Sequence, residues 1–145
     1  MGREVWLTVI GEQKDADGRK DRNSTQCRAW YEKRGDLHIF EYRETDPQSG
    51  EFTDSRLVFS KTGCSIERTG VVSTMMRFEP ERELECMYET GFGSIPMKIF
   101  TRRLAMREVG SNFHGRVVYD LHLQGGDPME CAVTVKAEPV KTNTV

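Results

Sequence analysis

The 145-residue sequence lacks the local patterns on which most catalytic, redox and metal sites depend. None of its four cysteines lies in a C-x-x-C pair, so the zinc and thioredoxin-type classes have no support. It contains no H-x-x-x-H pair, no nucleophile with an adjacent base and no phosphate-cradling glycine loop. We therefore predict no catalytic residue, no cofactor, no metal and no enzymatic activity, although the abundant glutamates leave a paired-carboxylate site open.

Long apolar runs and a basic excess are also missing. No stretch approaches the ~18 apolar residues of a membrane span, and no such run follows Met1 as it would in a signal peptide. The net charge of -2 argues against partners such as nucleic acid or an anionic membrane, but not against a local basic patch. The simplest expectation is a cytoplasmic protein with reduced cysteines that act as small buried hydrophobes.

Helical periodicity is absent, and short alternations of apolar and polar residues take its place. We predict one domain over residues 1–145, with a charged loop at 14–22 and a polar tail at 138–145. The alternation predicts ten strands, at 5–10, 25–32, 37–44, 52–60, 64–68, 74–78, 84–90, 95–106, 113–123 and 129–135. Such a chain forms two packed sheets or closes on itself. Because a meander favours closure, we expect an all-β antiparallel meander closed into a barrel of 8–10 strands.

The hairpin around Gly91-Phe92-Gly93 has enough pattern to fix its register. An even loop places the apolar residues on one face and pairs Glu85 with Lys98 on the other. The inward residues are then Leu84, Cys86, Tyr88, Ile95, Met97 and Ile99. The alternation fails after Thr101, so we predict a β-bulge at Arg102-Arg103 that either bends the strand or aims an arginine.

The last hairpin has a longer connection. We expect an odd loop that pairs Leu121 with Cys131 and Tyr119 with Val133. The outer face would then carry His114, Arg116, Asp120 and His122. His114 and His122 would be about 26 Å apart at ~3.3 Å per residue, too far to share a metal.

Arg68 is the most informative polar residue. It has the same parity as the apolar Cys64 and Ile66, and an odd loop pairs this inner face with residues 74, 76 and 78. A buried arginine requires an acid or a bound anion. The candidate ligand-binding residues on the inner face are Arg68, Tyr42, Glu44, Tyr88, Met97 and Tyr119. In the competing interpretation, Arg68 and Glu44 form a structural ion pair and the tyrosines fill volume.

Several of these strands contain short motifs whose order and spacing form a pattern. They are Tyr42-x-Glu44, Ile66-x-Arg68-x-Gly70, Met76-x-Phe78, Tyr88-x-Thr90-x-Phe92-Gly93-x-Ile95-x-Met97-x-Ile99-x-Thr101 and Gly115-x-Val117-x-Tyr119-x-Leu121. Together they resemble the YwiB-like family of bacterial proteins of unknown function, and the resemblance covers residues 5–137. The resemblance implies a calycin-like, lipocalin-like barrel and carries over no catalytic residue.

Two functional hypotheses follow. The first is non-enzymatic binding of a small amphipathic or anionic ligand inside the barrel. The second is a protein–protein interaction module or homodimer, because Trp6, Trp30 and Val118 fall on outward faces and exposed tryptophans often mark contact surfaces.

Overall fold

The computed structural model describes residues 2–70, 73–90 and 92–140, which form ten strands and no helix. The strands are β1 (Gly2–Lys14), β2 (Lys20–Arg34), β3 (Leu37–Thr45), β4 (Phe52–Phe59), β5 (Cys64–Thr69), β6 (Ser73–Phe78), β7 (Glu83–Thr90), β8 (Gly93–Val109), β9 (Asn112–Leu123) and β10 (Met129–Pro139). Within these ranges nothing forms a helix that could cross a membrane.

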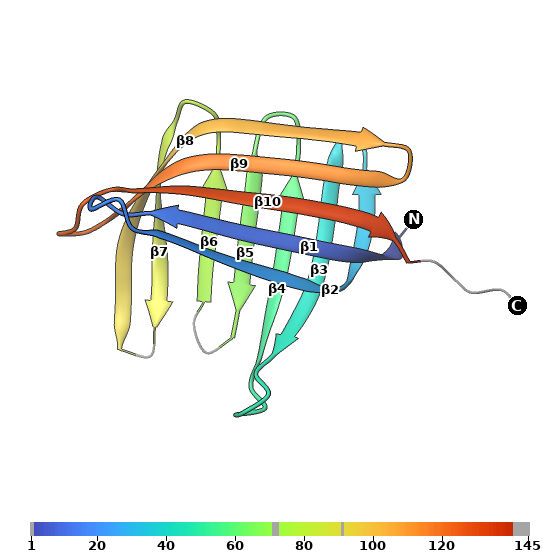
Figure 1. Ribbon diagram of the computed structural model, residues 1–145, viewed down its shortest axis with the longest axis horizontal. Helices are drawn as coiled ribbons and strands as arrows, with labels where there is room; N and C mark the ends of the chain where they lie inside the picture. The colour runs from blue at the N-terminus through green and yellow to red at the C-terminus, as the bar shows by residue number, and fades with distance from the viewer. Residues whose placement is uncertain (1, 71–72, 91, 141–145) are drawn as a thin grey trace, which may run out of the picture.

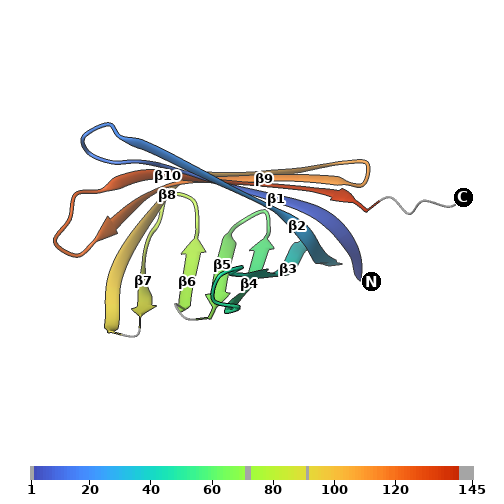
Figure 2. The same cartoon turned by 60° about the horizontal axis from the view of Figure 1, so that its bottom comes forward.

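Each strand pairs antiparallel with the next along the chain, and β1 pairs with β10 to close the barrel. The prediction of an all-β meander closed into a barrel is therefore confirmed. The barrel is flattened into two layers. Figure 1 shows the long β8, β9, β10, β1 and β2 running across one layer, and the shorter β3–β7 running steeply across the other. Figure 2 shows the long layer above the short one.

Aromatic rings fill the space between the layers. Phe40, Phe59 and Phe78 are fully buried, and the ring of Phe113 lies 5.1 Å from that of Phe40 and 5.4 Å from that of Phe59. Gly115 permits this packing, because a Cβ there would lie 2.8 Å from Phe59. Burial of such rings is the main stabilising contribution, at about 25 cal/mol per Å² of apolar surface removed from water. The middle of the barrel is thus occupied by side chains.

The predicted bulge lies in β8. The β8–β9 register shifts between Thr101 and Arg103. Up to Phe100 β8 also pairs with β7, whereas beyond the shift it pairs with β9 alone, so the bulge marks where β8 leaves the short layer. Arg102 points to Asp120 on β9, at 2.7 Å, in an exposed ion pair.

The register of the β7–β8 hairpin agrees with the prediction. Thr90 pairs with Gly93 across a two-residue loop, and Tyr88, Cys86 and Leu84 pair with Ile95, Met97 and Ile99. Residue 91 lies outside the described residues. Ile95 has the predicted inward parity, yet 41% of it is exposed.

The register predicted for the last hairpin is wrong by two residues. Tyr119 pairs with Cys131, and Leu121 pairs with Met129. Because a shift of two residues preserves the side-chain face, Tyr119, Leu121 and Cys131 are buried as expected.

Two predicted boundaries differ from the structure. Lys14 pairs with Lys20, so the β1–β2 connection covers only 15–19 instead of 14–22. Backbone pairing continues there although neither face has a core to cover. At the other end β10 extends to Pro139, which pairs with Val5, and residues 141–145 lie outside the described range.

Candidate ligand-binding site

One row of side chains crosses five strands on the inner face of the short layer. Each member is the cross-strand partner of the next: Tyr42 on β3, Ser55 on β4, Arg68 on β5, Thr74 on β6 and Tyr88 on β7. The predicted inward parity of Arg68 and its pairing with Thr74 are therefore correct. Arg68 is the only charged member of this row, and it lies between two hydroxyl side chains.

Arg68 does not have the predicted degree of burial. Its side chain is exposed, because β5 ends one residue later at the edge of the barrel that we call the mouth. Figure 1 shows β3, β5 and β7 ending at this same edge. Among the described residues, no ion pair or hydrogen bond satisfies the Arg68 guanidinium, and Glu44 is not within ion-pair distance. The structure thus gives no support to the interpretation that these two residues form an ion pair.

The Arg68 charge nonetheless acts on the interior. Burial raises the pKa of Tyr42 and Tyr119, and in both cases the Arg68 charge acts in the opposite direction. The Ser55 hydroxyl also lowers the pKa of Tyr42, although the two hydroxyls do not reach hydrogen-bond geometry. A positive charge without an ion-pair partner in the described structure therefore lies near two buried phenols.

Polar atoms without partners are found beside Arg68. The hydroxyls of Tyr42 and Ser55 are buried, and neither has a hydrogen-bond partner in the described structure; the same holds for Thr101 deeper in the barrel. A buried polar group left unpaired costs about 1–3 kcal/mol. Two such hydroxyls therefore lie in the same row as an arginine that has no ion-pair partner among the described residues.

A hollow of about 540 Å³ opens at the mouth over this row. Its lining residues are Glu44, Thr45, Asp46, Glu51, Thr53, Arg68, Thr74 and Tyr88. Three carboxylates thus share the hollow with one guanidinium. The Asp46 carboxylate also accepts a hydrogen bond from the backbone N–H of Gln48, at 2.8 Å. The hollow combines a cationic group on the inner row with acids toward the β3–β4 turn.

The six candidate residues separate into two groups. Arg68, Glu44 and Tyr88 line the mouth hollow, and Tyr42 lies beneath it in the same row. Met97 and Tyr119 are buried in the core, where the Tyr119 ring packs 4.7 Å from that of Phe78. The structure therefore places four candidates at one site and leaves two as core residues.

A second polar cluster, which sequence reasoning missed, lies at the opposite end of β3. His38 is 3% exposed; its Nδ1 lies 2.8 Å from Tyr31 Oη, and its Nε2 lies 3.4 Å from Glu108, which also binds Lys33 at 2.9 Å. A neutral ring satisfies both contacts when Tyr31 donates to Nδ1 and Nε2–H points to Glu108. His38 has the parity of Phe40 and Tyr42, so the alternation of β3 contained the signal for its burial.

Both nitrogens of His38 are engaged within the protein, which leaves no free lone pair for a substrate. Burial lowers the pKa of His38, against the nearby Glu108 charge, and the Lys33 hydrogen bond lowers the pKa of Glu108. This cluster closes one end of the barrel. No group of three or more metal-binding side chains occurs in the described part of the chain.

The architecture is that of a closed ten-stranded antiparallel barrel with a packed centre and an open, polar mouth. The chain belongs to the family described as a domain of unknown function, DUF1934, whose model matches residues 7–135. It is similar to the crystal structure of ywiB protein from Bacillus subtilis, with a TM-score of 0.83 and 18% identity over 97% of this chain and 94% of that chain. No curated protein matches the sequence.

Proposed function

We propose that the protein is a cytoplasmic, non-enzymatic, calycin-like barrel that binds a small anionic ligand at its mouth. The observation that carries the proposal is Arg68, a guanidinium on the inner row with no acidic partner, beside the unpaired hydroxyls of Tyr42 and Ser55. A carboxylate or phosphate oxygen in the hollow would accept from the Arg68 guanidinium, and charge-assisted hydrogen bonds of this type are among the strongest in proteins.

The packed centre limits the size of the ligand. Phe40, Leu57 and Phe78 occupy the interior, so the binding volume is the mouth hollow of about 540 Å³. This volume is within the range of small-molecule sites. A compact ligand is favoured over a long-chain amphiphile.

The acidic side of the hollow limits the ligand's charge distribution. Glu44, Asp46 and Glu51 would repel a ligand that is anionic along its whole length. A ligand whose inner end is anionic and whose outer end is neutral or cationic complements both Arg68 and these acids. The free cysteines in the described structure are compatible with the reducing cytoplasm that we propose.

Native mass spectrometry of protein purified without denaturation tests the proposal. We expect a small molecule retained by the wild-type protein and lost in Arg68→Gln. Arg56→Gln is the matched control, because Arg56 is exposed on the neighbouring strand and lies on the opposite face from Ser55. Equal retention by both variants would place the ligand elsewhere.

A second candidate function is homodimerisation through the exposed aromatic face of β1 and β2. Trp6 and Trp30 are 43% and 48% exposed, although the Arg28 guanidinium covers part of Trp6, at 5.2 Å from its ring centroid. Light scattering at increasing concentration tests this function. A dimer that Trp30→Ser dissociates would support it, whereas a monomer at every concentration would remove it.

A further inference from the structure

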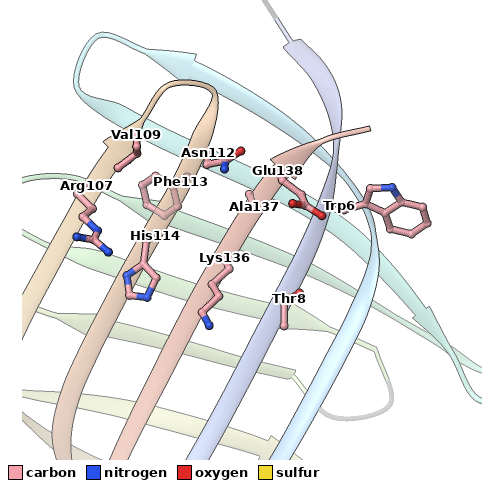
Figure 3. Close-up of a pocket in the computed structure, with 10 residues that line it drawn as sticks. All are labelled: Trp6, Thr8, Arg107, Val109, Asn112, Phe113, His114, Lys136, Ala137 and Glu138. Atoms are coloured by element: carbon pink, nitrogen blue, oxygen red, sulfur yellow. The ribbon is translucent and has the colours of Figure 1, made fainter. Parts of the chain in front are cut away.

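Three cationic or titratable side chains lie in register on the outer face of the long layer. Arg107 on β8 is directly opposite His114 on β9, and His114 is directly opposite Lys136 on β10. Figure 3 shows the three side by side on adjacent strands. Thr8 on β1 continues the row beyond Lys136.

This row is not neutralised by the protein. In the part of the chain that the structure describes, Arg107, His114 and Lys136 form no ion pair or side-chain hydrogen bond. Two other arginines on this layer have partners: Arg116 binds Glu12 at 3.3 Å and Thr134 at 2.6 Å, and Arg102 binds Asp120. Arg107 and Lys136 therefore place two positive charges on either side of His114, with no acid among the described residues paired to either of them. The protein as a whole is acidic, with a net charge of -2, so an overall excess of basic residues does not explain this row.

The row borders a hollow of about 450 Å³. One side is polar and includes Arg107, His114 and Lys136, and the exposed apolar surface comes from Val109 (Figure 3). Phe113 and Ala137 also line the hollow, but their side chains are buried in the core. Trp6 also lines the hollow, with its indole directed away from the row in Figure 3. Glu138 is the only acid among the lining residues.

We propose that the Arg107–His114–Lys136 row binds the phosphate group of a small phosphorylated molecule. A guanidinium supplies paired N–H donors, an ammonium supplies a point charge, and an imidazole between them supplies a third donor, which together match a tetrahedral dianion. The apolar side of the hollow would take the organic part of the molecule. This site is on the opposite face of the sheet from Arg68 and does not depend on the mouth.

His114 provides a readout specific to this geometry. The groups that face it are Arg107 on β8, Lys136 and Glu138 on β10, and Arg116 on its own strand. Burial and then the three cations lower its pKa. A dianion bound between Arg107 and Lys136 offsets their charge, so the pKa of His114 rises when phosphate binds.

The experiment is an NMR titration of the full chain with inorganic phosphate and, separately, with phenyl phosphate. We expect saturable shifts confined to β8, β9 and β10 and an increase in the pKa of His114. Lys136→Gln should weaken binding about tenfold, the effect of losing one charge-assisted contact. Tighter binding of phenyl phosphate than of inorganic phosphate would show that the apolar side takes part, and equal binding would limit the site to the phosphate group.

Arg103→Gln is the matched control, because Arg103 is exposed on β8, the strand that contains Arg107, and its register partner Val118 lies outside the hollow. It removes the same charge and should leave the affinity unchanged. The proposal is overturned if neither phosphate compound shifts the row at millimolar concentration, or if Arg103→Gln weakens binding as much as Lys136→Gln. Arg68→Gln should bind phosphate here normally, which separates this site from the mouth.

Discussion

Arg68 and Glu44 line the same hollow at the barrel mouth, yet no ion pair joins them. The arginine therefore contributes charge to the site without contributing a salt bridge to the fold. We expect Arg68→Gln to change the free energy of unfolding by no more than about 0.5 kcal/mol, as is usual for a surface substitution that removes no specific contact. Urea denaturation measures this. A loss of several kcal/mol would mean that Arg68 has a structural partner after all.

The unpaired hydroxyls give a prediction about stability. Thr101→Val removes a fully buried hydroxyl that has no hydrogen-bond partner, and the replacement has nearly the same shape. We expect the variant to be more stable by about 1 kcal/mol, because the desolvation cost of that hydroxyl disappears. Thermal unfolding followed by circular dichroism checks the direction.

Tyr31→Phe serves as the opposite case. Its hydroxyl is bonded to His38, so its removal leaves a buried ring nitrogen unpaired and should cost about 1–3 kcal/mol. If both substitutions were destabilising, the Thr101 hydroxyl would have a hydrogen-bond partner. The Tyr42 hydroxyl would then have to be tested for a partner in the same way.

The His38 cluster makes stability depend on pH. Because the pKa of His38 is lowered in the folded state from its usual 6.5, the unfolded chain binds more protons just below that pH. Stability should therefore fall as the pH drops below about 6.5 toward the lowered value. Glu108 adds a second loss below its usual 4.5, because its folded pKa is also lowered. Urea midpoints from pH 8 to 4 measure both losses. His38→Gln should reduce the first loss, leaving the part due to His114, whose pKa is also lowered, and should leave the second unchanged.

The alternation of apolar and polar residues predicted much of the fold. It predicted the register of Tyr88 with Ile95 and the pairing of Arg68 with Thr74, because hairpin parity fixes which side chains share a face. It also predicted the bulge after Thr101, where a strict alternation would have buried arginines.

Depth within the barrel was not predictable in this way. Parity gives the face of a residue but not its distance from the mouth, so Arg68 and Ile95 are inward in register and exposed in fact. The last hairpin was misregistered because parity cannot distinguish loops that differ by two residues, and Leu121 pairs with Met129 instead of Cys131.

The long, charged ends of β1 and β2 were missed for a related reason. The pairing of Lys14 with Lys20 rests on backbone hydrogen bonds that leave no apolar pattern in the sequence. The basic row on the outer face was missed because Arg107, His114 and Lys136 are adjacent only across strands, and no sequence spacing links them.

The most direct test of the central claim is the affinity of the mouth for a small carboxylate. Butyrate and 4-aminobutyrate would be titrated into wild-type protein, Arg68→Gln and Arg56→Gln, with amide shifts of β4, β5 and β6 followed by NMR. Binding at the mouth should weaken about tenfold in Arg68→Gln and remain unchanged in Arg56→Gln, and the amino compound should bind more tightly because Glu44, Asp46 and Glu51 attract its ammonium group. Equal affinities for wild type and Arg68→Gln would contradict the claim that Arg68 is the anion-binding group of this barrel.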